Sequence, residues 1–400
     1  MKKLFIIAPN DRFNYGDLLF PHIITAYFKA HFDEIVYCST TKSDLSDKGG
    51  FPTESFHILY NITPEDDNYL MVAGGECLCV EWGIILSFIS ERYEKLFLRI
   101  DKFTRKWTKE RRWRFRNFVA GKILHAKSYF PFTIGKNELP LFKGIFYNSL
   151  GGIGLARETY ILQRRKVRDI LKSVDYISVR DKVTGEILHS ADIPNTLAAD
   201  SAILLSDIFA EETLLGQINP ALRTRLEKPY IFFQCNETIA MRDMPEIVDE
   251  IVKIGQHFDC EICLCPIGTA TGHSDDKGLS EIYRRLQNTT VFSACHLVEN
   301  PTIYDIMWLI KHARLYVGAS LHGIITAMSF GVPYCGYCVE KVAHYIETWG
   351  DARCFAASTG QLSEACVHAC SQPAAPAEAQ KESVRKSFGK MRQYILVDEK

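Results

Sequence analysis

The sequence predicts an α/β protein that contains two doubly wound domains. Short apolar runs recur along the 400 residues, and most are followed by glycine or polar residues and then by a helix-like pattern. One series ends near Leu205 and a second begins after Lys228, so we expect the domain boundary between them. Polar residues follow several predicted strands, at the edge where parallel sheets bind ligands. We expect one domain at residues 1–210, a second at 211–370, and a linker with a C-terminal helix at 371–400.

The composition is that of an ordinary globular protein. Hydrophobic residues make up 47% of the chain, charged residues 24%, and the formal net charge is −1, which gives no support to global nucleic-acid binding. The first apolar run, Leu4–Ala8, is too short for a signal peptide, and no later run reaches the length of a membrane helix. We therefore expect a cytoplasmic location.

The thirteen cysteines do not predict a disulfide framework. Their number is odd and the chain is long. Two pairs have CxxC spacing, Cys260 with Cys263 and Cys335 with Cys338, but both fall in strand-like segments. We interpret them as small buried residues rather than as a zinc or redox site.

In the first domain, several predicted strands end in polar motifs. We expect strands at Lys3–Pro9, Glu34–Cys38, Phe56–Leu59, Tyr69–Ala73, Phe146–Leu150 and Tyr176–Val179. The residues that follow them include Asn14-Tyr15-Gly16-Asp17, Gly74-Gly75-Glu76, Gly151-Gly152-Ile153-Gly154 and Arg180-Asp181. Because the carboxyl ends of parallel strands share one edge of a sheet, Asp17, Glu76 and Arg180 are predicted to lie near one another. Asp17 can instead serve only as a helix cap.

Residues 91–127 interrupt the alternation of strands and helices. They contain thirteen Lys/Arg and four Asp/Glu, a net charge of +9. Leu96, Ile100, Phe103 and Trp107 fall on one stripe of a helix. A basic amphipathic helix rich in Trp and Phe suits an anionic membrane surface or a phosphate-bearing lipid. The same stripe also fits a helix that packs on its own domain or forms an oligomer contact.

The second domain repeats the strand–helix pattern. We expect strands at Pro229–Phe233, Glu261–Pro266, Val291–Phe292, Leu315–Val317 and Tyr334–Cys338. The predicted helices are Pro245–Phe258, Leu279–Leu286, Pro301–His312, Ile324–Phe330 and Val342–Gly350. A polar loop with His273, Asp275 and Asp276 lies between two of these elements, and Glu382–Tyr394 is the expected C-terminal helix.

The segment from Tyr316 to Pro333 has the strongest functional pattern of this domain. A short strand ends at Gly318, and an apolar helix is closed by Gly331 and Pro333. The residues between them are Ser320, Leu321, His322 and Gly323. First-turn amides and the helix dipole favour an anion there, and His322 can transfer a proton to a molecule bound over them. The alternative is a buried histidine that only stabilises the turn.

The ordered set of motifs resembles the polysaccharide pyruvyl transferase family. The residues that carry the resemblance span about 4–350 and are NYGD at 14–17, GGE at 74–76, GGIG at 151–154, SVRD at 178–181, DSA at 200–202, SLHG at 320–323 and VEKV at 339–342. The resemblance implies two Rossmann-like domains that face a cleft, an architecture similar to GT-B glycosyltransferases. It also implies transfer of the pyruvyl group of phosphoenolpyruvate to a sugar of a cell-surface polysaccharide or its precursor, with formation of a ketal.

The resemblance places functional residues at specific positions. Family positions fall on Arg180 and His322, with a weaker match at Lys341, whereas many members carry arginine where this chain has Ser320. The expected donor site is Arg180, Ser320, Leu321, His322, Gly323 and Lys341, with His322 as the proton-transfer group. The expected acceptor site is Asn14, Tyr15, Gly16, Asp17 and Glu76, with Asp17 and Glu76 orienting or deprotonating hydroxyls. No metal and no cofactor other than phosphoenolpyruvate as co-substrate is expected.

Two other functions fit the same pattern. One is a GT-B glycosyltransferase that uses a nucleotide sugar, and the other is a non-catalytic glycan-binding component of a polysaccharide assembly complex. The basic segment 91–127 favours a lipid-diphosphate-linked saccharide acceptor and a peripheral position on the inner membrane face. The sequence leaves the acceptor sugar and the oligomeric state open.

Overall fold

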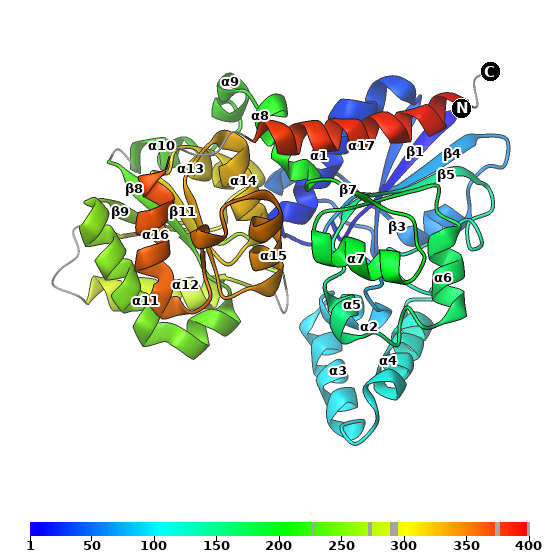
Figure 1. Cartoon of the computed structure of the whole chain (residues 1–400), viewed down its shortest axis with the longest axis horizontal. Helices are drawn as coiled ribbons and strands as arrows, with labels where there is room; N and C mark the ends of the chain where they lie inside the picture. Colours follow the sequence, from blue (N-terminus) through cyan, green and yellow to red (C-terminus); the bar gives the residue numbers. More distant parts are fainter. Residues whose placement is uncertain (226–227, 271–273, 289–294, 373–376, 398–400) are drawn as a thin grey trace.

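The fold consists of two parallel β-sheets covered by helices. The computed structural model describes residues 1–225, 228–270, 274–288, 295–372 and 377–397. Figure 1 shows the two sheets side by side, each between layers of helices. This is the predicted α/β architecture with two Rossmann-like halves. The predicted strand at Val291–Phe292 and His273 lie outside the described residues.

Seven parallel strands form the first sheet. Their spatial order is β3 (Glu54–Ser55), β2 (Glu34–Ser39), β1 (Lys2–Ile7), β4 (Asp67–Val72), β5 (Phe142–Leu150), β6 (Tyr176–Val179) and β7 (Thr196–Leu197). The chain runs outward from β1 in one direction to β3 and then returns to β4 on the other side of β1. The strand order therefore reverses between β1 and β4, and ligands bind at such a point in doubly wound sheets.

Helices α1 to α10 precede the second sheet in the chain, and Glu211 in α9 pairs with Lys311 of the second half. Their bounds are α1 (Tyr15–Phe28), α2 (Trp82–Ser87), α3 (Glu91–Phe103), α4 (Lys109–Ile123), α5 (Gly154–Arg157), α6 (Arg165–Lys172), α7 (Lys182–Ser190), α8 (Leu205–Ile208), α9 (Glu211–Leu215) and α10 (Pro220–Arg225). Helix α1 begins at Tyr15 with Asn14 as its N-cap residue, so Asp17 lies in the first turn and Pro21 in the second. The strand predicted at Phe56–Leu59 is wrong, because these residues form a 3-10 helix. A short apolar run does not distinguish the two.

Six parallel strands form the second sheet. Their order is β10 (Cys295–Leu297), β9 (Glu261–Leu264), β8 (Tyr230–Gln234), β11 (Leu315–Gly318), β12 (Tyr334–Tyr337) and β13 (Phe355–Ala356). The order reverses between β8 and β11. The helices are α11 (Glu237–Phe258), α12 (Asp276–Gln287), α13 (Ile303–Lys311), α14 (Leu321–Phe330), α15 (Glu340–Trp349) and α16 (Leu362–Ser371).

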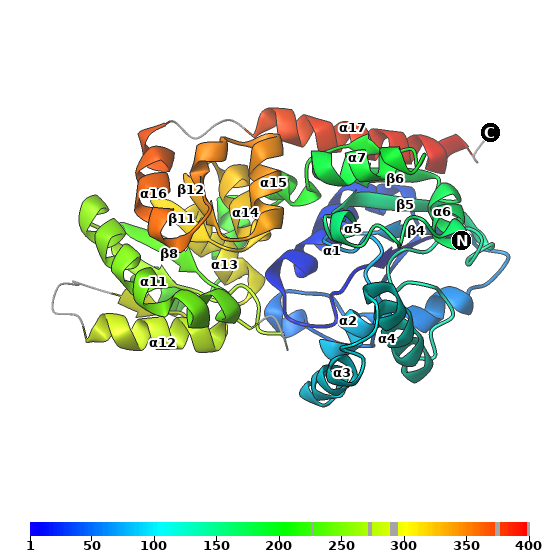
Figure 2. The ribbon, with the colours of Figure 1, turned by 60° about the horizontal axis from the view of Figure 1, so that its bottom comes forward.

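The two halves are joined by a shared core and by the last helix. The largest hydrophobic cluster contains Leu4 and Ile6 of β1 together with Phe232 of β8 and Tyr316 of β11. Helix α17 (Glu378–Val397) crosses from the second half to the first, where it lies along the first sheet (Figures 1 and 2).

Helix α17 belongs to the first half by its contacts. Phe388 of α17 packs on Tyr27 and Phe28 of α1, with ring centroids 5.4 and 5.1 Å away. Tyr394 packs on Phe146 of β5 at 6.0 Å. The expected C-terminal helix is therefore present and packs on the first half.

Candidate active site

A cavity of about 560 Å³ lies between the two halves, at the carboxyl ends of both sheets. Both reversals of strand order open into it, because its walls come from the segments after β1, β4, β8 and β11. Its polar wall consists of Arg12, Asn14, Asp17, Glu76, Arg180, Gln234, Asn236, Asp275, Ser320, His322 and Lys341. Two Rossmann-like halves thus place their expected ligand-binding edges against one space.

The segment after β1 is fixed to the second half by backbone hydrogen bonds. The Tyr15 amide donates to the Ile267 carbonyl at 2.9 Å, and the Thr269 amide donates to the Phe13 carbonyl at 3.1 Å. The Tyr15 hydroxyl lies 2.9 Å from Thr326 Oγ1 of α14. The start of α1, which carries Asp17, is therefore held in register with the start of α14, which carries His322.

Gly16 permits the close approach of these two helix ends. A Cβ atom at residue 16 would lie 1.8 Å from Nδ1 of the His322 ring, so any side chain would displace that ring. The His322 ring also contacts the Phe20 ring edge-on, with the two ring centroids 5.3 Å apart. Gly16 and Phe20 of α1 thus fix the position of the imidazole.

Arg180 is held by two carboxylates. Its Nη1 donates to Asp200 Oδ2 at 3.0 Å, and its Nη2 donates to Glu76 Oε2 at 2.8 Å. The side chain is only 2% exposed. Burial alone would lower the pKa of Arg180, but Glu76 and Asp200 raise it above its ordinary value, so the guanidinium stays charged. Much of its hydrogen-bonding capacity is therefore used within the protein.

Both carboxylate oxygens of Glu76 accept hydrogen bonds. Its second oxygen, Oε1, accepts the Ile153 amide at 2.7 Å. The preceding Gly75 has φ of +85°, a left-handed conformation that favours glycine and that turns the chain after β4. A Cβ at Gly151 would lie 2.2 Å from Glu76 Oε2, so the GGIG motif provides the room for this ion pair. Glu76 connects β4, β5 and β6 rather than presenting a free carboxylate.

His322 lies beside the same network. Its Nε2 is 3.7 Å from Asp200 Oδ2, the oxygen that also accepts from Arg180. Nε2 is buried and has no hydrogen-bond partner among the described residues. Asp200 is fully buried; burial raises the pKa of its carboxyl, but His322 and Arg180 lower it below its usual value overall. The charged Asp200 carboxylate therefore lies beside the imidazole of His322.

Asp17 differs from Glu76 and Asp200 because no hydrogen bond or ion pair engages it within the described part of the chain. Its carboxyl is buried and lines the cavity. Burial raises its pKa to about 6, against the opposing effects of His322, Arg12, Lys341 and Arg180. A carboxyl with a pKa near 6 can accept a proton from a bound hydroxyl near neutral pH.

Arg12 was not identified from the sequence, although it follows β1 as the other site residues follow their strands. Its side chain is 10% exposed and lines the cavity. Nε donates to Asp11 at 2.8 Å and Nη2 lies 2.7 Å from the same oxygen, but Nη1 is buried and without a partner in the described structure. The only signal was its position two residues before Asn14, the first residue of NYGD.

Lys341, at the start of α15, supplies a second cation to the cavity. No carboxylate of the described residues lies within 4 Å of its ammonium group. Burial and the charge of Arg180 lower the pKa of Lys341, because an isolated ammonium is costly there. Arg12 and Lys341 are therefore cations that can still bind an anionic ligand, whereas Arg180 is already paired with Glu76 and Asp200.

Most of the predicted site residues line the cavity, and a few lie behind it. Asn14, Asp17, Glu76, Arg180, Ser320, Leu321, His322 and Lys341 are in its wall. Tyr15 and Gly16 are buried at the joint between the halves, and the amide of Gly323 lies 3.5 Å from the Ser320 hydroxyl that caps α14. Beyond Arg12, sequence reasoning missed Gln234, which donates to Asp275 at 3.0 Å and accepts from the Ala319 amide at 3.0 Å.

Cys77 is the one cysteine in the wall of this cavity among the described residues. No disulfide joins any of the thirteen cysteines, which include both CxxC pairs. One group of potential metal ligands occurs in the described residues, Asp351, Cys354 and His368, with ligand atoms within 4.8 Å of one another. Asp351 already accepts from His368 at 2.8 Å and from Arg353 at 3.0 Å. An internal ion-pair network accounts for that group.

Comparison with known proteins gives a family and a fold. The model of a family described as polysaccharide pyruvyl transferase matches residues 14–336. No curated protein sequence matches significantly.

Solved structures of UDP-GlcNAc 2-epimerases have the same architecture. The enzyme from Methanocaldococcus jannaschii, in complex with UDP-GlcNAc and UDP, aligns with a TM-score of 0.54 and 12% identity over 96% of this chain and 99% of its own. The enzyme from Neisseria meningitidis, bound to UDP-GlcNAc, aligns with a TM-score of 0.57 and 8% identity over 99% and 100% of the two chains. At this identity the likeness establishes the GT-B-like fold alone.

Proposed function

Since this chain belongs to the polysaccharide pyruvyl transferase family, we propose that it transfers the pyruvyl group of phosphoenolpyruvate to a saccharide and forms a ketal on two hydroxyls. The observation that supports this most is the pair of cations with free capacity, Arg12 and Lys341, in the cavity that also holds His322 and Asp17. Phosphoenolpyruvate carries a carboxylate and a phosphate, which such a pair can bind.

Arg12 and Lys341 are the proposed ligands of these anionic groups. Arg180 is occupied by Glu76 and Asp200, so we assign it a positioning role, in which it orients Asp200 and adds positive charge to the wall. Ser320 and Leu321 at the start of α14 line the same wall, where the helix N-terminus favours an anion. Arg12 thus supplies an arginine to a site in which residue 320 is serine.

His322 is the proposed acid. It would give its proton to the methylene carbon of phosphoenolpyruvate, which makes the neighbouring carbon electrophilic. The first sugar hydroxyl then adds to that carbon, phosphate leaves, and the second hydroxyl closes the ketal. Of the two hydroxyl protons released, one restores His322 and the other leaves with phosphate. The Asp200 carboxylate lies 3.7 Å from Nε2 of this imidazole.

Asp17 is the proposed base for an acceptor hydroxyl. It faces the cavity without an ion pair within the described residues, and its pKa is about 6. Glu76 accepts from Arg180 and from the Ile153 amide, so we assign it to positioning. Asn14, the N-cap residue of α1, is in the wall close to Asp17 in sequence and is proposed to bind the acceptor.

Transfer from a nucleotide sugar is the second candidate. The structural relatives named above are complexes with UDP or UDP-GlcNAc, and their fold is shared. Phosphoenolpyruvate and a nucleotide sugar are both anionic, and either could bind to Arg12 and Lys341. The choice between the two donors therefore depends on measured binding.

Isothermal titration calorimetry with phosphoenolpyruvate, UDP and UDP-GlcNAc tests the proposal. We expect phosphoenolpyruvate to bind the wild-type protein and both nucleotides to bind at least tenfold more weakly. Arg12→Ala and Lys341→Ala should each weaken phosphoenolpyruvate binding about 10- to 100-fold, which matches the loss of one charge-assisted contact.

Lys386→Ala is the matched control, because Lys386 is exposed on α17. It should bind phosphoenolpyruvate as the wild type does. Binding of UDP alone, lost in the same two cavity variants, would support glycosyl transfer instead. Binding of none of these donors together with binding of a glycan would support the non-catalytic alternative.

A further inference from the structure

A helical hairpin formed by α3 and α4 projects from the first half of the molecule. Figures 1 and 2 show the two helices standing away from the sheet, next to α2. The predicted single stripe is interrupted, because α3 ends at Phe103 and α4 begins at Lys109. Each helix packs one face inward through buried residues, Phe97 of α3 and Trp113 and Asn117 of α4. The outward faces are left without protein cover.

The outward faces carry a large excess of positive charge. Residues 91–127 have a net charge of +9, whereas the whole chain has −1. Arg116 pairs with Glu81 and Asp101, and Lys95 pairs with Glu91. The remaining eleven cations of this segment have no carboxylate within 4 Å among the described residues: Arg92, Arg99, Lys102, Arg105, Lys106, Lys109, Arg111, Arg112, Arg114, Lys122 and Lys127.

Large apolar side chains are exposed among these cations. Phe103 is 76% exposed, Leu98 63% and Phe118 62%. Ile84 of the adjoining α2 is 38% exposed. Exposure of large apolar side chains to water costs free energy. Several of them on one projecting element indicate a surface that a partner covers.

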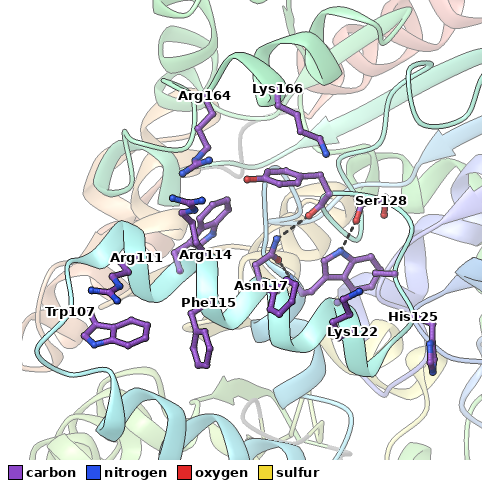
Figure 3. A pocket seen from close by; sticks show the side chains of 16 residues that line it. Trp107, Arg111, Arg114, Phe115, Asn117, Lys122, His125, Ser128, Arg164 and Lys166 are labelled. Atoms are coloured by element: carbon purple, nitrogen blue, oxygen red, sulfur yellow. Dashed lines mark hydrogen bonds between the residues drawn. The ribbon is translucent and has the colours of Figure 1, made fainter.

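Figure 3 shows how the cations and aromatic rings are arranged along α4. A cavity of about 980 Å³ is lined by Trp107, Phe115 and Phe118 together with Arg111, Arg114, Lys122, Arg164 and Lys166. The Arg111 guanidinium lies 4.3 Å from the Trp107 ring centroid, and the Lys122 ammonium lies 5.8 Å from that of Phe118. Cationic groups beside half-exposed aromatic rings are the combination that binds the headgroup region of an anionic bilayer.

We propose that the α3–α4 hairpin docks the protein on the surface of an anionic lipid bilayer. The net charge of +9 is complementary to anionic headgroups, and Leu98, Phe103 and Phe118 would enter the interface. A second copy of the chain is a poor occupant, because two surfaces of the same high charge repel. Contact is at the surface, since no helix in the described ranges is both long and apolar enough to cross a membrane.

Helix α2 connects the hairpin with the cavity between the two halves. Ile84, Ile85 and Phe88 line the cavity between the two halves, and the same short helix packs on the hairpin, where Gly83 closely approaches Phe97 and Arg116. A docked hairpin would therefore hold the mouth of that cavity close to the headgroups. The arrangement suits a saccharide acceptor linked through phosphate to a lipid, a consequence that rests on the proposed function.

Vesicle flotation tests the docking surface. Wild-type protein is mixed with vesicles of phosphatidylcholine alone or with one third phosphatidylglycerol, at low and at high salt. We expect flotation with the anionic vesicles only, and its loss at high salt. Phe103→Asp combined with Phe118→Asp, and Arg105→Glu combined with Lys106→Glu, should each reduce the bound fraction at least tenfold.

Two matched controls and one binding measurement complete the design. Met241→Asp changes a side chain that is 65% exposed on α11, and Lys277→Glu combined with Lys386→Glu changes two exposed cations outside the hairpin. Both should float as the wild type does. Every variant should bind phosphoenolpyruvate equally in solution, which separates this proposal from the proposed function. No flotation of the wild type, equal flotation of hairpin and control variants, or self-association through the hairpin without lipid would overturn it.

Discussion

At the scale of single residues, the three carboxyl groups nearest Arg180 and His322 have different surroundings. Glu76 and Asp200 both accept from Arg180, whereas Asp17 is engaged by no hydrogen bond within the described structure. Burial without a partner raises the pKa of Asp17 to about 6, above the 3.8 of an ordinary aspartate. Such a group costs stability when it is charged, and groups of this kind are frequent at functional sites.

The Asp17→Asn variant should be more stable and inactive. The neutral form of Asp17 is favoured in the folded state, so its contribution to the free energy of unfolding is full below pH 3.8 and is lost as the pH rises through about 6. Asparagine has no such loss. We expect the variant to be more stable than the wild type at pH 8, by up to about 3 kcal/mol, and to lose this advantage towards pH 4.

Urea unfolding at several pH values measures that difference, and turnover measures the function. Turnover of Asp17→Asn should fall at least 100-fold, which is typical for a general base. Phosphoenolpyruvate binding should persist, because the substitution removes a negative charge from the cavity. A stability difference that does not change with pH would refute the assignment.

At the scale of elements, the site depends on how closely α1 and α14 approach. Their first turns meet at Gly16 and His322, and backbone hydrogen bonds from the segment before α1 to the segment after β9 hold that contact. Small displacements of a proton donor are costly to a reaction, because catalysis requires the reacting atoms at near-contact distance.

Gly16→Ala should therefore lower turnover strongly. The new methyl group would lie 1.8 Å from His322 Nδ1, so the imidazole must move. We expect a loss of about 100-fold in kcat with a smaller change in phosphoenolpyruvate binding. Gly389→Ala is the control, because nothing lies within 4 Å of its added Cβ on α17. Normal kcat in the Gly16 variant would show that His322 does not act from the position described.

Some elements and site residues could be predicted from the sequence, and others could not. Strand ends such as NYGD and GGE were readable because parallel strands share one edge. The 3-10 helix at Phe56–Tyr60 was not, because four to five apolar residues fit either element. The pairing of Arg180 with two carboxylates was also hidden, since Glu76 and Asp200 lie 104 and 20 residues away in the chain. Arg12 was overlooked because no motif contains it.

At the scale of the whole molecule, the two halves act as one body through shared elements. The C-terminal helix α17 crosses to the first half, and Trp349 of α15 donates to the Arg180 carbonyl at 2.7 Å. The core cluster that includes β1 and β8 also includes Phe388 and Met391 of α17. Loss of α17 packing should therefore weaken the first half as well as the connection between the halves.

Phe388→Ala tests this coupling. Phe388 is fully buried against Tyr27 and Phe28, so the truncation should lower the free energy of unfolding by about 3–5 kcal/mol. Lys386→Ala, on an exposed position two residues away, should change it by less than about 0.5 kcal/mol. Chemical denaturation of both variants gives the comparison. Equal stability would mean that α17 is not docked in solution.

The proposed donor site consists of Arg12 and Lys341 in the cavity between the halves, with His322 in the same wall. The most direct measurement is a crystal structure of the wild-type protein with phosphoenolpyruvate. We predict its phosphate and carboxylate within hydrogen-bond distance of Arg12 and Lys341, and its methylene carbon within reach of the His322 ring. Phosphoenolpyruvate bound elsewhere on the molecule, or bound in this cavity without contact to either cation, would contradict the account.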